Sequence, residues 1–100
     1  MSWTLFCVPT TQKAELDAAL RDDQVARQSQ KVRDAPSVGG PSGHLYVLIE
    51  GGDDAVKRAE TLLAPVGTKL PSAEADGLYR KFKDEDEAAS AGMGLFFTEG

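Results

Sequence analysis

Two short segments of the chain are apolar on both of their alternating faces, which is typical of central strands covered on both sides. The first segment is residues 3–8, and Pro9 is expected to end it because proline has no amide hydrogen to donate to a sheet. The second is residues 44–50, "HLYVLIE". The two faces are Trp3, Leu5 and Cys7 against Thr4, Phe6 and Val8 in the first segment, and Leu45, Val47 and Ile49 against His44, Tyr46, Leu48 and Glu50 in the second.

An amphipathic helix is predicted after the first strand. We expect Thr10 or Thr11 to cap it and the helix to run to about Asp22. Its inward-facing residues are Leu16, Ala19 and Leu20. Residues 25–34 are polar, and their apolar residues no longer recur at helical spacing. We therefore expect the end of a helix followed by an edge strand, whose charged side chains discourage pairing with other chains.

The second strand is followed by the clearest helical pattern of the chain, in residues 51–65. Asp53 or Asp54 is expected to cap its start, where negative charge also favours the helix dipole, and Pro65 to stop it. A short strand, residues 66–70, is predicted to follow. The apolar stripe of the helix is Ala55, Val56, Ala59, Leu62 and Leu63.

One more helix and one more strand complete the pattern. The helix lies between Ser72 and Ala91, and a start after Gly77 is considered because glycine costs a helix about 1 kcal/mol relative to alanine. Gly92 is expected to terminate it, and residues 95–98, "LFFT", to form the last strand. The inward-facing residues of the helix are Ala75, Leu78, Tyr79, Phe82 and Ala89.

This order of elements predicts an α+β domain of the ferredoxin-like βαββαβ plan, with helices on one face of the sheet and a helix and strand added at the carboxyl-terminal side. Residues 1–100 are too few for a second core, so we expect a single domain. In this plan the first and third strands lie side by side at the centre, and they are the two most apolar segments. The plan serves many unrelated functions and therefore names none.

Charge and cysteine content narrow the class of protein. Sixteen acidic and eleven basic residues give a net charge of −5, which disfavours binding to nucleic acids and to anionic membranes. Cys7 is the only cysteine, which excludes an internal disulfide and gives no reason to expect an oxidising compartment. The amino-terminal residues lack a basic segment and a long apolar run, so we expect a cytoplasmic protein.

The stretch "SVGGPSGH", residues 37–44, is the first candidate ligand site, through Gly39, Gly40 and Gly43. It lacks the lysine and hydroxyl of a P-loop, and it precedes a strand instead of a helix, unlike a dinucleotide-binding loop. A hairpin tip whose glycines adopt positive φ is the favoured interpretation. Such a loop can still close over a ligand.

The stretch "IEGGDD", residues 49–54, is the second candidate, because it joins a central strand to a helix whose first amide groups point outward. Its ligand contacts would come from Gly51, Gly52, Asp53 and Asp54. The two aspartates argue against an anion, and capping of the helix by their side chains is the favoured interpretation.

Catalytic and metal chemistry have less support. Cys7 and His44 would approach each other if the first and third strands pair antiparallel, and a thiol beside an imidazole can become a nucleophile. No third group that would orient the histidine is recognisable, and a small core residue is the favoured role of Cys7.

One cysteine and one histidine do not make a zinc site, and the acidic run of residues 84–87 lacks the spacing of a calcium loop. No metal or cofactor is therefore expected.

The second face of the sheet is apolar as well, with Tyr46 and Leu48 on it, and something must cover it. Either the added helix with Tyr79 and Phe82 does so, or a second subunit does, and we expect a homodimer. The function that follows is a binding or regulatory module that self-associates through its sheet; a small molecule is a candidate ligand, but the sequence does not identify it. An enzyme that uses Cys7 with His44, or the carboxylates of residues 53 and 54, and a subunit that serves only in assembly are the alternatives.

Overall fold

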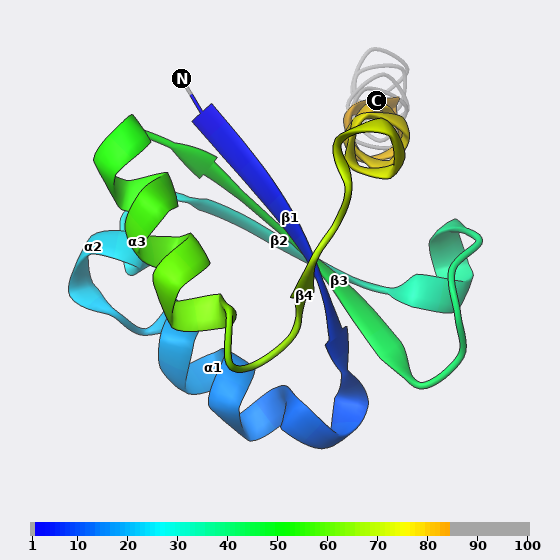
Figure 1. Ribbon diagram of the computed structural model, residues 1–100, viewed down its shortest axis with the longest axis horizontal. Coiled ribbons are helices and arrows are strands. Elements are labelled where there is room, and N and C mark those ends of the chain that lie inside the picture. The colour runs from blue at the N-terminus through cyan, green and yellow to red at the C-terminus, as the bar shows by residue number, and fades with distance from the viewer. Residues whose placement is uncertain (1, 85–100) are drawn as a thin grey trace, which may run out of the picture.

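The computed structural model describes residues 2–84 and shows a mixed α+β fold with a four-stranded antiparallel sheet (Figure 1). Residues 72–84 are helical and are called helix 72–84 below. The predicted strand of residues 95–98, together with Ala89 and Gly92, lies outside the described residues. The elements in chain order are β1 (Ser2–Pro9), the 3-10 turn η1 (Thr10–Gln12), α1 (Lys13–Leu20), α2 (Asp23–Ala26), β2 (Ser29–Asp34), the 3-10 turn η2 (Ala35–Val38), β3 (His44–Gly51), α3 (Asp53–Leu63), β4 (Thr68–Lys69) and helix 72–84.

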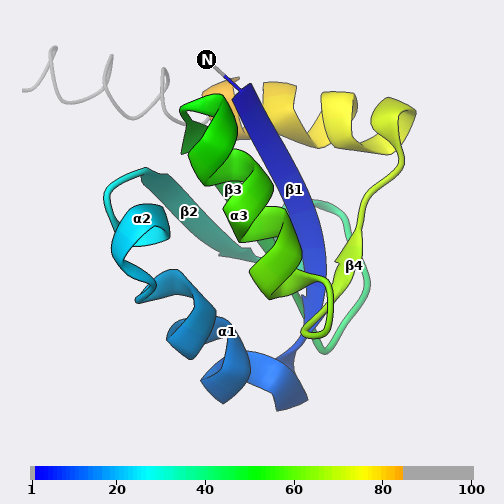
Figure 2. The ribbon, with the colours of Figure 1, turned by 60° about the vertical axis from the view of Figure 1, so that its left-hand side comes forward.

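The sheet has the strand order β2-β3-β1-β4, and every neighbouring pair is antiparallel. The two apolar segments of the sequence, β1 and β3, are therefore the central strands, as predicted. Their register places Cys7 opposite Tyr46 and Pro9 opposite His44. The edge position predicted for β2 is confirmed, and β4 is only two residues long at the other edge (Figure 2).

One face of the sheet is covered by α1, α2 and α3, which lie together on one side (Figure 1). The helices contribute the apolar stripes predicted from their periodicity, with Leu16 and Leu63 both 1% exposed. The alternation of the two central strands supplies the other half of this core. The cluster consists of Phe6, Val8, Leu16, Val25, Leu45, Val47, Ile49, Ala59, Leu63 and Val66, with Ala19, Leu20 and Leu62 packed against it.

The opposite face of the sheet is covered by helix 72–84, which lies on the other side of the sheet from α1, α2 and α3 (Figure 1). Helices therefore occupy both faces, and the face that led us to expect a second subunit is packed by the chain itself. The cluster on this face consists of Leu5, Ala35, Val38, Tyr46, Leu48, Leu70, Ala75, Leu78 and Phe82, with Trp3, Cys7 and Tyr79 packed against it.

Helix starts differ from the expectations at three places. Thr10 and Thr11 do not cap α1, because the chain enters the η1 turn directly after Pro9 and the residue before α1 is Gln12, which makes no side-chain cap. An N-cap needs extended backbone, and residues inside a helical turn lack it.

The other two starts concern α3 and helix 72–84. Gly52 occupies the cap position of α3, so that Asp53 and Asp54 fall in its first turn, where their charge still favours the dipole. Helix 72–84 begins before Gly77. Burial of its apolar side chains offsets the low helix propensity of the glycine.

Candidate ligand-binding site

The glycine-rich loop leads from β2 through η2 to β3, and the strands it joins are antiparallel neighbours, as a hairpin requires. Gly39 and Gly43 have φ values of 83° and 75°, the left-handed conformation predicted for the tip. Gly40 packs on the ring of Tyr46, because a Cβ at this position would lie 2.5 Å from the tyrosine hydroxyl oxygen. The loop is therefore held against the second face of the sheet.

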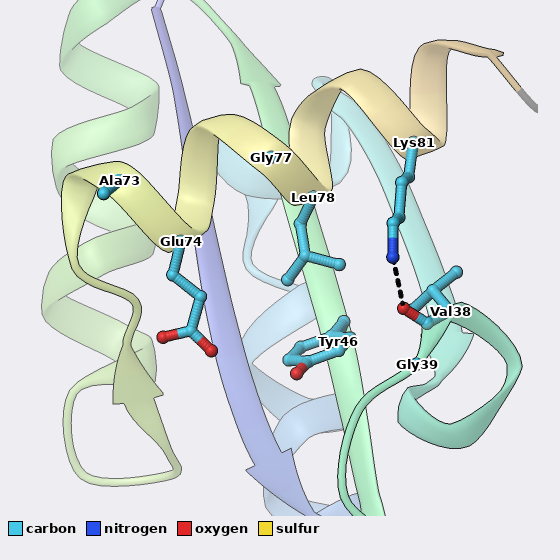
Figure 3. Close-up of a pocket in the computed structure, with 8 residues that line it drawn as sticks. All are labelled: Val38, Gly39, Tyr46, Ala73, Glu74, Gly77, Leu78 and Lys81. Carbon is cyan, nitrogen blue, oxygen red and sulfur yellow. Dashed lines mark hydrogen bonds between the residues drawn. The ribbon is translucent and has the colours of Figure 1, made fainter.

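A pocket of about 250 Å³ lies between this loop, β3 and helix 72–84 (Figure 3). Its floor is formed by Tyr46, which is 4% exposed, and its walls come from the loop on one side and the helix on the other. Of the predicted ligand-binding glycines, only Gly39 lines it. The lining residues are Val38, Gly39, Tyr46, Ala73, Glu74, Gly77, Leu78 and Lys81.

The charged groups of the pocket come from helix 72–84. Glu74 and Lys81 are seven residues apart, which is two helical turns, so both extend from the same side of the helix with Leu78 between them (Figure 3). Lys81 reaches the loop and donates a hydrogen bond from Nζ to the carbonyl oxygen of Val38 at 3.1 Å. No basic residue among residues 2–84 forms an ion pair with Glu74.

Two groups beside Glu74 are held in their neutral forms. Burial, the Cys7 thiol and the Glu74 carboxylate raise the pKa of Tyr46. Burial, followed by the Glu74 carboxylate, raises the pKa of Cys7 in the same way. At neutral pH the pocket therefore presents a phenol that can donate a hydrogen bond, and the Cys7 thiol, which does not line the pocket, stays protonated.

The register of β1 and β3 does not make Cys7 and His44 direct partners. Cys7 lies opposite Tyr46, and His44 lies opposite Pro9, two positions along β3. The Nδ1 atom of His44 lies 3.0 Å from the carbonyl oxygen of Ser42. Because thiolates and not thiols are nucleophiles, the raised pKa of Cys7 argues against the catalytic role considered for this pair.

The second predicted site, residues 51–54, lies at the other end of β3. Seven residue steps along a strand separate it from the start of β3 by about 23 Å, so the two glycine segments do not form one site. Two of its polar groups are also engaged within the chain. The amide of Gly52 donates to Oε1 of Gln28 at 3.3 Å, and Asp53 accepts a hydrogen bond from the hydroxyl of Ser2.

A polar cluster anchors helix 72–84 to the sheet near this end. Tyr79 donates to Oε2 of Glu50 at 2.5 Å, and Lys83 donates to Oε1 at 2.9 Å. The Tyr79 ring stacks on Trp3 with centroids 4.4 Å apart and an interplanar angle of 11°. Burial acts to raise the pKa of Glu50, but the hydrogen bonds from Tyr79 and Lys83 outweigh it and keep the pKa below its usual value. Both oxygens of the Glu50 carboxylate therefore accept hydrogen bonds from helix 72–84, and these bonds attach the helix to β3.

Sequence reasoning missed Glu74 and Lys81 as site residues. Their spacing with Leu78 places them on one helical face, but that pattern is common to most exposed helices. Their significance depends on Tyr46 and Gly39, which belong to distant parts of the chain, so only the packed structure reveals the pocket.

Comparison with known proteins found no family model, no curated protein and no solved structure that matches this chain. Within residues 2–84, no three side chains of histidine, cysteine, aspartate or glutamate are grouped so that they could hold a metal ion. No helix in this part of the chain combines the length and the apolar character that crossing a membrane requires.

Proposed function

We propose that the protein is a binding module for a small polar molecule, which it holds in the pocket between the glycine-rich loop and helix 72–84. The observation that carries this proposal is that Glu74, Lys81 and Tyr46 line one pocket, with the apolar side chain of Leu78 between the two charged residues. Ligand sites are concave and present a few placed polar groups beside apolar ones, and this pocket has both kinds of group in its lining.

The size of the pocket limits the ligand. About 250 Å³ is below the range of about 300–1,000 Å³ that is typical of sites for drug-sized ligands. A small metabolite fits this volume, whereas a dinucleotide cofactor does not.

Binding is favoured over catalysis by the state of the reactive groups. Cys7 and Tyr46 both have raised pKa values, so neither is activated as a nucleophile or as a base at neutral pH. The enzymatic alternative with residues 53 and 54 is less supported, because Asp53 is engaged by Ser2 and the pocket lies at the other end of β3.

The fold proposed for this module is ferredoxin-like, with helix 72–84 added on the second face. Support comes from the order β2-β3-β1-β4 with all neighbours antiparallel, and from helical connections between β1 and β2 and between β3 and β4. Homodimer formation is a separate proposal. A dimer would have to use another surface or displace helix 72–84, and analytical ultracentrifugation measures whether it forms.

The proposed function is tested by screening a metabolite library for an increase in melting temperature, since a ligand that binds only the folded state raises it. The Gly77→Phe variant should abolish the response to any ligand that the pocket binds, because Gly77 lines the pocket and a Cβ at this position meets no heavy atom within 4 Å, which leaves room for a large side chain at the pocket wall. Gly77→Ala is the matched control, and it should keep the response. A ligand that stabilises both variants equally would contradict the proposal.

A further inference from the structure

We propose that the ligand is a small zwitterion whose ammonium group faces Glu74 and whose carboxylate faces Lys81. This inference rests on the proposed function, and it assigns the chemical class of the ligand. It follows from the opposite signs of the two charges, from their spacing along helix 72–84 and from the neutral phenol between them.

The spacing of the two charges sets the length of the ligand. Seven residues along an α-helix correspond to about 10 Å of axial rise between Glu74 and Lys81. The ligand has to span part of this rise, because its ammonium and carboxylate groups each need a charge-assisted hydrogen bond to one of the two side chains. The charges of a β-amino or γ-amino acid lie further apart than those of an α-amino acid, so we expect the longer zwitterions to bind.

The signs of the charges exclude the simpler ligand classes. A dicarboxylate would place one anionic group against Glu74, and a diamine would place one cationic group against Lys81. Lys81 has an ammonium group with three donors, and the carbonyl of Val38 accepts from only one of them. Two donors are thus left for a carboxylate at the loop side of the pocket.

Tyr46 and Leu78 fit the middle of such a ligand. Tyr46 stays protonated, so its hydroxyl can donate a hydrogen bond to the carboxylate as Lys81 does. The side chain of Leu78 lies between the two charged residues and offers an apolar surface to the methylene groups of the ligand (Figure 3).

The test is a titration followed by NMR with γ-aminobutyrate and β-alanine as zwitterions, butyrate and butylamine as single-charge analogues, and succinate as a dianion. The zwitterions should bind at least tenfold more tightly than either single-charge analogue. In Glu74→Gln the zwitterions should lose this advantage over butyrate, and in Lys81→Met they should lose it over butylamine.

Matched controls separate a local contact from a general change in charge. Glu15→Gln and Lys57→Met alter exposed residues of α1 and α3 on the opposite side of the sheet, and they should leave the affinities unchanged. The double variant Glu74→Lys with Lys81→Glu should regain at least half of the lost selectivity, because the zwitterion can then bind in the reverse orientation.

The results distinguish this inference from the proposed function. If butyrate, butylamine or succinate binds as tightly as the zwitterions and Gly77→Phe abolishes that binding, the zwitterion inference is wrong and the pocket is still a ligand site. Zwitterion binding that survives both Glu74→Gln and Lys81→Met also overturns the inference. If neither these compounds nor a broad library of small polar molecules binds, both are wrong.

Discussion

Replacing Phe82 by alanine should destabilise the protein strongly, because Phe82 carries much of the packing of helix 72–84 on the sheet. Its side chain is 1% exposed and belongs to the cluster that contains Leu5, Tyr46 and Leu48. Truncating a buried phenylalanine costs about 3–5 kcal/mol, the sum of the lost apolar burial and of the cavity that is left.

The free energy of unfolding of the Phe82→Ala variant is measured by urea denaturation. With a stability of about 5–15 kcal/mol for a domain of this size, the loss should move the urea midpoint clearly downward and leave the m-value near that of the wild type. Phe6→Ala is the matched control, since Phe6 is 2% exposed in the cluster on the opposite face and should cost a similar amount.

A loss below about 1 kcal/mol for Phe82→Ala, together with a large loss for Phe6→Ala, would refute this reasoning, because an exposed side chain costs little when it is truncated. It would mean that helix 72–84 does not pack on the sheet in solution. The pocket would then lose one of its walls, and the proposed function would fail with it.

Two further predictions concern the titrating groups. The rate of Cys7 alkylation should increase with pH, with a midpoint above the ordinary pKa of a thiol, because burial and Glu74 raise the pKa of Cys7. A midpoint below about pH 8 would instead support a nucleophilic role for Cys7. Asp22 accepts hydrogen bonds from Arg58 at 2.8 and 2.6 Å, and its pKa is lowered to about 2. The ionised Asp22 carboxylate therefore stabilises the fold at pH values above its unfolded pKa, and this stabilisation is lost as the pH falls through its folded pKa. Asp22→Asn should reduce the dependence of the free energy of unfolding on pH between about pH 4 and 2. An unchanged pH dependence would contradict this.

Much of the fold could be predicted because apolar periodicity reports directly on burial. Both faces of β1 and β3 are apolar, and both are covered, one by α1 and α3 and the other by helix 72–84. The helix starts were predicted less well, since a cap depends on the backbone conformation that the preceding residue imposes. Pro9 leads straight into a 3-10 turn, and Gly52 takes the cap position that was assigned to an aspartate.

The candidate site could be predicted only in part. The glycine-rich loop was identified from its composition, and Gly39 does line the pocket. The charges opposite it were missed, because Glu74 and Lys81 are 35 and 42 residues away from Gly39 in the sequence and reach the pocket only through the packing of helix 72–84 on the sheet. The position of residues 51–54 between a strand and a helix made them the other candidate, but they lie at the far end of β3, and the folded chain engages the Gly52 amide and the Asp53 carboxylate itself.

The proposed ligand, a small polar molecule, binds between the glycine-rich loop and helix 72–84. The most direct measurement is an NMR titration of the uniformly ¹⁵N-labelled chain with the ligand that raises the melting temperature most. We expect amide shift changes concentrated at residues 38–40 and 73–81 and near Tyr46. Shift changes concentrated at residues 51–54, with none at the loop or at helix 72–84, would contradict it.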